Sequence, residues 1–329
     1  MKDLNSIVRY RLWSAVLASC TLIAFAAPAV AQTWPTRPIT AVVPLAAGSA
    51  SDVMGRVVLD QVSRQVGQPI VVENRPGAGG TIGANVVAKA PPDGNTILVY
   101  GALAISHALY SKLPYSTLDD FAPVVPIGQQ PLVLVTAPAK GFKTLADLIA
   151  AAKARPGALN YASAGIGSAS HFAAERLRVS AGIEAQHVTF RGANEALTEV
   201  VGGRVDFIYI PIAPALPLIN DGKLVALAIS AETRAAELPD VPTSGEAGLA
   251  NSAYPFWSGL FVPAKTPRDI IVRLHDETEK ALQLAAVQER LAKLGVEPMP
   301  MSLDQFEKFF RDDVAANVQL VKAAHIPTQ

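Results

Sequence analysis

Short apolar segments rich in β-branched residues alternate with longer segments of helical periodicity along most of this chain. The first strand-like segment spans residues 39–44, and the next segment, 51–66, carries an apolar residue at every fourth position from Met54 to Val66. That spacing indicates a helix with one buried face. Regular alternation of strands and helices is typical of α/β proteins, in which helices cover mostly parallel sheets.

The same patterns predict the remaining elements. Further strands are expected at 70–73, 96–100, 132–136, 160–163, 188–190, 207–210, 224–230 and 258–262. Helices are expected at 81–90, 145–154, 168–181, 193–201, 214–220, 267 to about 284, and 302 to about 324. Thr144 with Asp147, Thr266 with Pro267, and Ser302 with Gln305 have the spacing of helix amino-terminal caps.

The chain shows no flexible linker between domains. The segments where it could cross from one domain to another are themselves strand-like: 124–128 leading into 132–136, and 254–262 on the return. A boundary between independent domains would usually be rich in Pro, Gly or Ser. We therefore predict two lobes, with residues 32–130 and 254–329 forming lobe 1 and residues 131–253 forming lobe 2.

The first 31 residues differ from the rest. Lys2, Arg9 and Arg11 precede an apolar run at 12–25, and Ala29-Val30-Ala31 supplies small residues at a signal-peptidase site. The run is short for a membrane span. We predict a signal peptide cleaved after Ala31 and export to the periplasm; a retained anchor is the alternative.

Leu17-Ala18-Ser19-Cys20 also resembles a lipoprotein cleavage box. The residues after Cys20 remain apolar, whereas a lipoprotein usually begins with a polar segment, so we favour cleavage after Ala31. Cys20 is the only cysteine. Its removal would leave a mature chain that can form neither disulfides nor thiolate metal sites.

Composition argues against several classes of function. Lys and Arg together number 28, as do Asp and Glu, and no basic stripe or tail stands out, so we expect no nucleic-acid partner. The five histidines include no pair spaced for a metal on a helix, and no G-x-S-x-G motif occurs. We expect no metal, no cofactor and no enzymatic activity.

Two small-residue turns lead from a strand into a helix, at 44–52 (PLAAGSASD) and 161–171 (YASAGIGSASH). Free N–H groups at a helix start, together with the helix dipole, favour an anion. One such turn in each lobe could hold a dicarboxylate from both sides of a cleft. Alternatively, both are ordinary turns, capped by Ser51 or Asp52 and by Ser168.

The glycine-rich segment 77–83 (GAGGTIG) mimics a nucleotide-binding loop. Residues 73–76 separate it from the preceding strand, whereas a dinucleotide site needs its turn directly after the strand, so we disfavour nucleotide binding. His171 and His187 are interpreted as structural. A hydrolase would require Ser168 and His171 as a working pair, oriented by a third group.

Together these segments resemble the Bug family, the periplasmic receptors of tripartite tricarboxylate transporters. The resemblance covers nearly the whole mature chain and rests on 70–80 (IVVENRPGAGG), 92–94 (PDG), 113–115 (LPY), 120–124 (DFAPV), 161–171, 187–192 (HVTFRG), 203–206 (GRVD) and 257–264 (WSGLFVPA). It implies a two-lobed periplasmic-binding-protein fold, of the Venus-flytrap, type II-like kind, with one carboxylated ligand held largely by backbone N–H groups and water.

Carried over by position, the resemblance implies ligand contacts from both lobes. They are Leu45, Ala46, Gly48 and Asp52 in lobe 1, Ser163, Ala164, Gly167 and Ser168 in lobe 2, and Gly192 and Asp206 shaping the cleft. The chain departs from the family pattern at Leu45, where an aromatic is usual, at Ala47 and at Ser49, which could add a hydrogen-bond donor, as could His107. The ligand therefore cannot be carried over.

The sequence as a whole predicts a periplasmic, monomeric solute-binding protein. Its ligand would be a small carboxylate, either a di- or tricarboxylate, an acidic amino acid or an aromatic acid. Its partners would be the membrane permease subunits of a tripartite tricarboxylate transporter. Two alternatives stay open: an exported hydrolase that uses Ser168 and His171, and a ligand sensor that docks to a membrane receptor.

Overall fold

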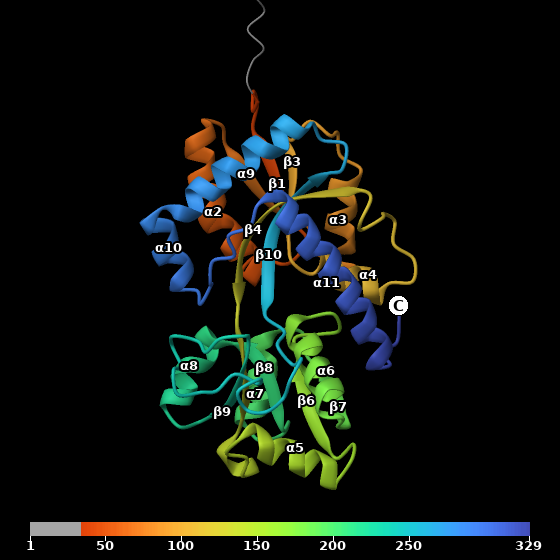
Figure 1. Ribbon diagram of the computed structural model, residues 1–329, viewed down its shortest axis with the longest axis vertical. Helices are drawn as coiled ribbons and strands as arrows, with labels where there is room; N and C mark the ends of the chain where they lie inside the picture. Colours follow the sequence, from red (N-terminus) through yellow and green to blue (C-terminus); the bar gives the residue numbers. More distant parts are fainter. Residues whose placement is uncertain (1–33) are drawn as a thin grey trace, which may run out of the picture. The chain divides into compact units, whose positions relative to one another are not determined.

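The computed structural model describes residues 34–329, of which residues 37–329 form one compact unit. That unit contains two five-stranded sheets with helices packed against them, which confirms the predicted two-lobed α/β fold (Figure 1). The predicted signal peptide and Cys20 lie outside the described residues. Among the helices of the described part, none is long and apolar enough to cross a membrane.

The sheet of lobe 1 has the strand order β2-β1-β3-β10-β4. Its strands are β1 (Ile39–Val43), β2 (Ile70–Asn74), β3 (Thr96–Tyr100), β4 (Phe121–Gln130) and β10 (Phe256–Pro263). The first three run parallel, but β10 is antiparallel to both β3 and β4. The returning strand therefore lies inside this sheet and joins the last part of the chain to the first.

The sheet of lobe 2 has the order β7-β6-β8-β5-β9. Its strands are β5 (Leu132–Thr136), β6 (Leu159–Ser163), β7 (Ala185–Thr189), β8 (Phe207–Pro211) and β9 (Val225–Ser230). Strand β6 is parallel to β7 and β8, whereas β5 is antiparallel to β8 and β9. Only Pro131 separates β4 from β5, so the chain passes from one sheet to the other without a linker.

The helices cover both faces of each sheet. They are α2 (Ala50–Val66), α3 (Thr81–Ala88), α4 (Leu103–Leu109), α5 (Leu145–Ala154), α6 (Ala169–Ala181), α7 (Ala193–Val201), α8 (Ile212–Asn220), α9 (Arg268–Gln283), α10 (Ala285–Ala292) and α11 (Leu303–Ala323). Figure 1 shows α2, α9 and α10 on one side of the first sheet and α3, α4 and α11 on the other.

Local signals located most helix starts. The capping boxes of Thr144 with Asp147 and of Ser302 with Gln305 are both formed. One prediction was wrong in detail: α9 begins at Arg268 after Pro267, and the Thr266 hydroxyl instead donates to the Pro263 carbonyl. Sequence patterns also missed α4 and α10, two short helices of seven and eight residues.

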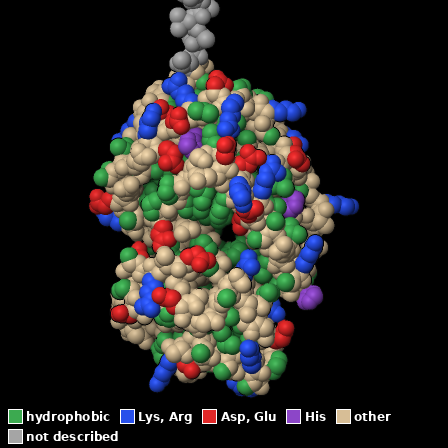
Figure 2. Space-filling view, viewed as in Figure 1, with side chains coloured by type: hydrophobic (Ala, Val, Ile, Leu, Met, Phe, Trp, Pro, Cys, Tyr) green, Lys and Arg blue, Asp and Glu red, His purple; other side chains and the backbone are tan. Residues whose placement is uncertain are grey.

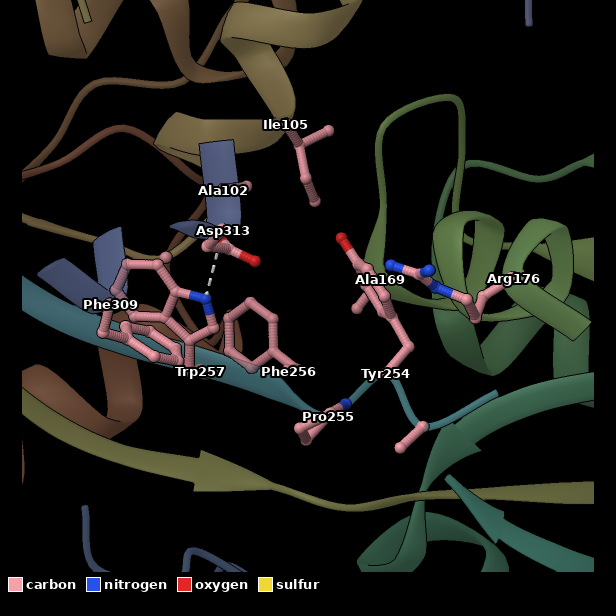
Figure 3. Close-up of a pocket in the computed structure, with 12 residues that line it drawn as sticks. Ala102, Ile105, Ala169, Arg176, Tyr254, Pro255, Phe256, Trp257, Phe309 and Asp313 are labelled. Atoms are coloured by element: carbon pink, nitrogen blue, oxygen red, sulfur yellow. Dashed lines mark hydrogen bonds between the residues drawn. The ribbon is translucent and has the colours of Figure 1, made fainter. Parts of the chain in front are cut away.

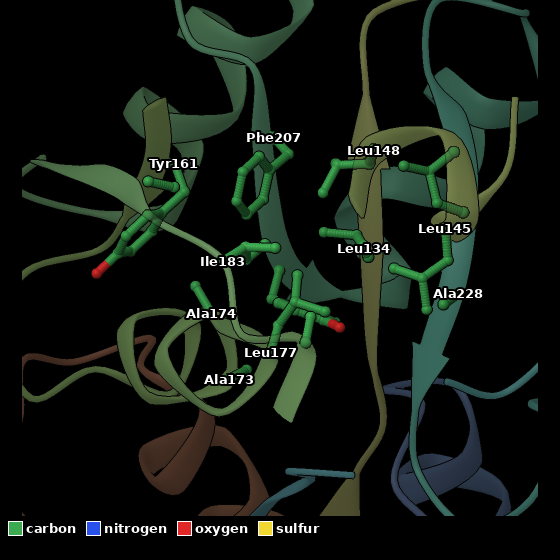
Figure 4. Close-up of a cluster of buried hydrophobic side chains, with 14 of the residues drawn as sticks. Leu134, Leu145, Leu148, Tyr161, Ala173, Ala174, Leu177, Ile183, Phe207 and Ala228 are labelled. Carbon is green, nitrogen blue, oxygen red and sulfur yellow. The ribbon is translucent and has the colours of Figure 1, made fainter. Parts of the chain in front are cut away.

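Each lobe has its own apolar core. In lobe 1 the rings of Trp257, Phe261, Phe306 and Phe310 pack together beneath α11. In lobe 2 one cluster gathers leucines and rings from β5, β6, β8, α5 and α6 (Figure 4). Burial of each such side chain contributes about 1.5–3 kcal/mol. Separate cores hold each sheet rigid, and with it the turns at the strand ends.

A smaller cluster joins the lobes. Phe172 of α6 packs with Ile105 and Leu109 of α4 and with Leu320 and Val321 of α11. Phe172 belongs to lobe 2 and the other four residues belong to lobe 1. The two lobes are thus in apolar contact beside the site described next.

Candidate functional site

A cavity of about 630 Å³ lies between the lobes, at the carboxyl ends of the parallel strands. Lobe 1 contributes Leu45, Gly48, Ser49, Ala50, Gly79, Tyr100, Ala102 and Phe256, and lobe 2 contributes Leu132, Ala164, Ile166, Gly167, Ser168, Ala169, Ser170, Gly192, Ala193, Asn194, Glu195, Tyr209, Ile210 and Pro211. Figure 2 shows the molecule hollowed between the two lobes, with hydrophobic and acidic side chains around the hollow. A site at these strand ends is usual for open α/β sheets.

The turn after β1 forms the lobe 1 wall. Gly48 adopts a φ of 81°, a left-handed conformation that favours glycine. Its N–H donates to Asp52 Oδ2 at 2.9 Å, while Asp52 Oδ1 accepts from Arg56 Nε at 2.9 Å and from Asn74 Nδ2 at 2.9 Å. Burial opposes ionisation of Asp52, but these hydrogen bonds and the Arg56 charge prevail and lower its pKa. Asp52 does not line the cavity and instead holds the turn in shape.

The start of α2 is not capped by a side chain. Ser49 occupies the N-cap position with an extended backbone, yet its side chain makes no capping hydrogen bond. Within residues 34–329, Ser49 Oγ is buried without a hydrogen-bond partner, and the N–H groups of Ala50, Ser51 and Asp52 are paired with no acceptor. The first turn of a helix has no intrahelical acceptors for its amides. Lobe 1 therefore offers free donors at the cavity wall.

The turn after β6 is organised differently, because its own side chains take up many of its donors. The Gly165 N–H donates to Ser163 Oγ at 3.1 Å, and the Ala164 N–H donates to Ser170 Oγ at 3.0 Å. Ser163 is fully buried, and its Oγ also lies 2.6 Å from His187 Nε2. Ser163 thus lies behind the cavity wall and supports the turn from inside lobe 2.

Side chains also bond to the backbone at the start of α6. Ser168 Oγ accepts from the His171 N–H at 3.3 Å and donates to the Gly165 carbonyl at 2.7 Å. His171 Nδ1 accepts from the Gly167 N–H at 3.2 Å. The side-chain pair between Ser168 and His171 that a hydrolase would need is not formed, since both groups bond to the backbone. The N–H groups of Ala164, Gly165, Gly167 and His171 are therefore bonded within the turn, whereas those of Ile166, Ala169 and Ser170 have no acceptor within residues 34–329.

Two histidines support this turn in their neutral form. The rings of His171 and His187 stack with centroids 4.2 Å apart, and Tyr161 stacks on His187 at 4.7 Å. Burial, followed by repulsion from His187 in its protonated form and from the Arg178 charge, lowers the pKa of His171 to about 3. Burial and Arg178 lower the pKa of His187 to about 4. Neutrality of His171 leaves its Nδ1 lone pair free to accept from Gly167.

A third helix start borders the cavity, and sequence reasoning named only its first residue, Gly192. Gly192 is the N-cap of α7 and has no side chain with which to cap it. Glu195, at the third helical position, lines the cavity, and its Oε2 accepts from the Arg191 N–H at 3.2 Å. Among residues 34–329, Glu195 is the only charged residue in the cavity lining. The sequence could have indicated Glu195 through its position, because acidic residues are favoured in the first turn of a helix.

Asp206 does not reach this site. It precedes β8, whereas the cavity lies at the other end of that strand, at Tyr209 and Pro211. Asp206 Oδ1 lies 2.6 Å from Lys140 Nζ, and Asp206 Oδ2 accepts from the Asn160 N–H at 2.7 Å. The prediction from sequence that Asp206 shapes the cleft was therefore wrong. Ala46 is exposed and also lies outside the lining, whereas Leu45, Gly48, Ser49, Ala164, Gly167, Ser168 and Gly192 all line the cavity.

The glycine-rich segment packs against tyrosines. The Tyr100 hydroxyl donates to the Gly79 carbonyl at 2.5 Å, and a Cβ at Gly80 would collide with that hydroxyl. A Cβ at Gly79 would lie 2.7 Å from the Tyr110 hydroxyl. Close packing therefore accounts for the glycines that resemble a nucleotide loop.

A second, smaller cavity of about 140 Å³ adjoins the first and shares Ala102, Ala169 and Phe256 with it. Figure 3 shows Asp313 on one side and Arg176 on the other. Trp257 Nε1 donates to Asp313 Oδ2 at 3.1 Å. Burial raises the pKa of Asp313 to about 6 despite this hydrogen bond. Within the described chain, no group of three or more His, Cys, Asp or Glu side chains is arranged to hold a metal ion.

Comparison with known proteins places these features in context. A family model described as "Tripartite tricarboxylate transporter family receptor" matches residues 54–326. Protein BugT of Bordetella pertussis is 37% identical over 292 residues, which cover 88% of this chain and 90% of BugT.

Two solved structures share both the fold and about a third of the sequence with this chain. An R. palustris protein solved with adipate is 30% identical with a TM-score of 0.80, and the match covers 90% of this chain and 100% of that one. MatC from Rhodopseudomonas palustris, solved with bound malate, is 33% identical with a TM-score of 0.76, covering 88% of this chain and 100% of MatC.

Proposed function

Because the chain belongs to the tripartite tricarboxylate transporter receptor family, we propose that it captures a small carboxylate in the cavity between its lobes. After export and removal of the signal peptide, the loaded receptor would deliver this ligand to the membrane permease subunits of such a transporter. The bound adipate and malate of the two related structures support a carboxylate ligand here.

The uncapped start of α2 carries this proposal. The described part of the chain places no Lys or Arg in the cavity lining, so backbone donors and the helix dipole must recognise the negative charge. Ala50, Ser51 and Asp52 supply free N–H groups, and the buried Ser49 hydroxyl lies beside them without a partner within residues 34–329. A carboxylate at this point would satisfy several of these donors at once.

Lobe movement would complete the binding step. The ligand would first bind the lobe 1 wall, and lobe 2 would then close until the tip of its turn, at Ile166, covers the other end. A ligand that binds the closed state better by a few kcal/mol suffices to shift the population toward it. Water could bridge the carboxylate to more distant donors at little loss of affinity.

Thermal unfolding of the mature protein with and without carboxylates tests the proposal. A ligand at one hundred times its Kd adds about 2.7 kcal/mol to stability, which raises the melting temperature measurably. The panel includes mono-, di- and tricarboxylates, acidic amino acids and aromatic acids. If no carboxylate raises the melting temperature, the proposed function is wrong.

The variant Ala50→Pro locates the site. Ala50 is the first residue of α2, where proline fits a helix and removes only the N–H. Loss of a hydrogen bond to a charged group costs about 1.5–3 kcal/mol, so we expect affinity to fall roughly 10- to 100-fold while the protein still folds. Unchanged affinity in this variant would place the carboxylate elsewhere.

A further inference from the structure

We propose that the cavity selects ligands with one carboxylate and an uncharged, mainly apolar remainder, and that Glu195 is the residue that rejects a second carboxylate. This inference rests on the proposed function and specifies its substrate class. It departs from the expectation that both lobes offer equivalent anion sites, because the two walls of the cavity differ in their charge.

The first step concerns the donors. In lobe 1, the amides at the start of α2 are paired with no acceptor within residues 34–329. In lobe 2, the N–H groups of Ala164, Gly167 and His171 already donate to Ser170, His171 and Ser168. The N–H groups of Ile166, Ala169 and Ser170, however, are paired with no acceptor within residues 34–329. Both walls therefore offer backbone donors, and what distinguishes them is charge.

The second step concerns charge. The start of α7 would be the natural place for a second carboxylate, because Gly192 does not cap it. Glu195 stands in that first turn and lines the cavity, and its carboxylate accepts a hydrogen bond from the Arg191 N–H. A full negative charge exceeds the partial positive charge of about one half at a helix start. The lobe 2 wall is thus unfavourable for an anion.

The third step concerns the apolar lining. Leu45 and Ile166 line the cavity from the turns of the two lobes, and Leu132, Ile210 and Phe256 add further apolar residues to the lining. Ile166 is 51% exposed, one of few large hydrophobic side chains so exposed in the described chain. Covering such surface with an apolar ligand body contributes roughly 25 cal/mol per Å². An aliphatic or aromatic body fits these surroundings.

Arg176 is the nearby cation that could bind a second carboxylate of the ligand. It lines the smaller neighbouring cavity, where it faces the Asp313 carboxylate. A long dicarboxylate could reach it only by competing with that carboxylate. Preference for dicarboxylates would therefore be the sign that Arg176, and not Glu195, governs the far end of the ligand.

Calorimetric titration with matched probes tests the inference. The probes are hexanoate with adipate and benzoate with terephthalate, so each pair differs by one carboxylate on a body of similar size. At about 6 Å and an effective dielectric between protein and water, repulsion between two carboxylates corresponds to about tenfold in affinity. We expect the monocarboxylate of a bound pair to bind about tenfold more tightly, and Glu195→Gln to reduce that ratio by about tenfold through tighter dicarboxylate binding.

Glu237→Gln is the matched control, because Glu237 is an exposed acid of lobe 2 outside the cavity lining. We expect it to leave the ratio unchanged. A wild-type preference for dicarboxylates would overturn the inference while leaving the proposed function intact. An unchanged ratio in Glu195→Gln, or an equal effect of Glu237→Gln, would overturn the role of Glu195. If none of the four probes binds while another carboxylate of the melting-temperature panel does, the inferred ligand class is wrong and the proposed function stands.

Discussion

The turns that begin α2 and α6 have the same layout in sequence but present different surfaces to the cavity. Each places a serine at the N-cap, Ser49 and Ser168, with a polar residue three positions later. Ser168 caps its helix, and His171 binds back to Gly167. Ser49 does not cap, and Asp52 holds Gly48 instead. The comparison teaches that similar small-residue turns can leave different amides free.

The largest expected contrast is in their response to acid. The lobe 2 turn depends on neutral histidines whose folded-state pKa values, about 3 for His171 and about 4 for His187, lie below the unfolded value near 6.5. Their contribution to stability is present above pH 6.5 and is lost as pH falls toward 4. Each histidine should cost about 1.4 kcal/mol per pH unit in that window.

The contribution of the lobe 1 turn to stability should be lost only at lower pH. The pKa of Asp52 is lowered, so its contribution persists until pH falls below the usual aspartate value near 3.8. Asp313 acts in the opposite direction. Its pKa is raised to about 6, so the carboxyl becomes protonated as pH falls below 6 and the cost of burying its charge is relieved. Urea denaturation from pH 7 to pH 4 measures the net slope. His187→Gln should flatten it, and an equally steep slope in that variant would contradict the prediction.

The next largest contrast concerns carboxylate affinity when a single backbone N–H is removed from one helix start. Ala50, Ala169 and Ala193 are the first residues of α2, α6 and α7, so proline can replace each at similar cost to the helix. We expect Ala50→Pro to weaken carboxylate binding about tenfold or more, and Ala169→Pro and Ala193→Pro to weaken it about threefold or less. Equal losses in all three variants would show that both lobes bind the charge alike.

The smallest contrast concerns stability without ligand. Ser168→Ala removes a capping bond and should lower the free energy of unfolding by about 1 kcal/mol. Ser49→Ala removes no capping bond and should change it by less than about 0.5 kcal/mol. Chemical denaturation of the two variants at pH 7 measures the difference. A loss in Ser49→Ala as large as in Ser168→Ala would mean that Ser49 does cap α2.

Sequence by itself determined the elements and most helix starts. The strands at 96–100 and 132–136 and the helices at 145–154 and 193–201 have the predicted bounds. Periodicity and capping boxes are encoded within a few neighbouring residues, so they can be read locally. Helices α4 and α10 were not predicted, because a helix of fewer than three turns gives too little periodicity to recognise.

Only the tertiary structure decided which residues share the cavity and which donors remain free there. Asp206 and Tyr209 stand three positions apart, but Asp206 precedes β8 whereas Tyr209 lies at the middle of the strand, and only Tyr209 lines the site. Glu195 entered the site because α7 begins beside α2 and α6 in space. These outcomes depend on strand order and on side chains that turn back onto the backbone, and both bring together residues far apart in the chain.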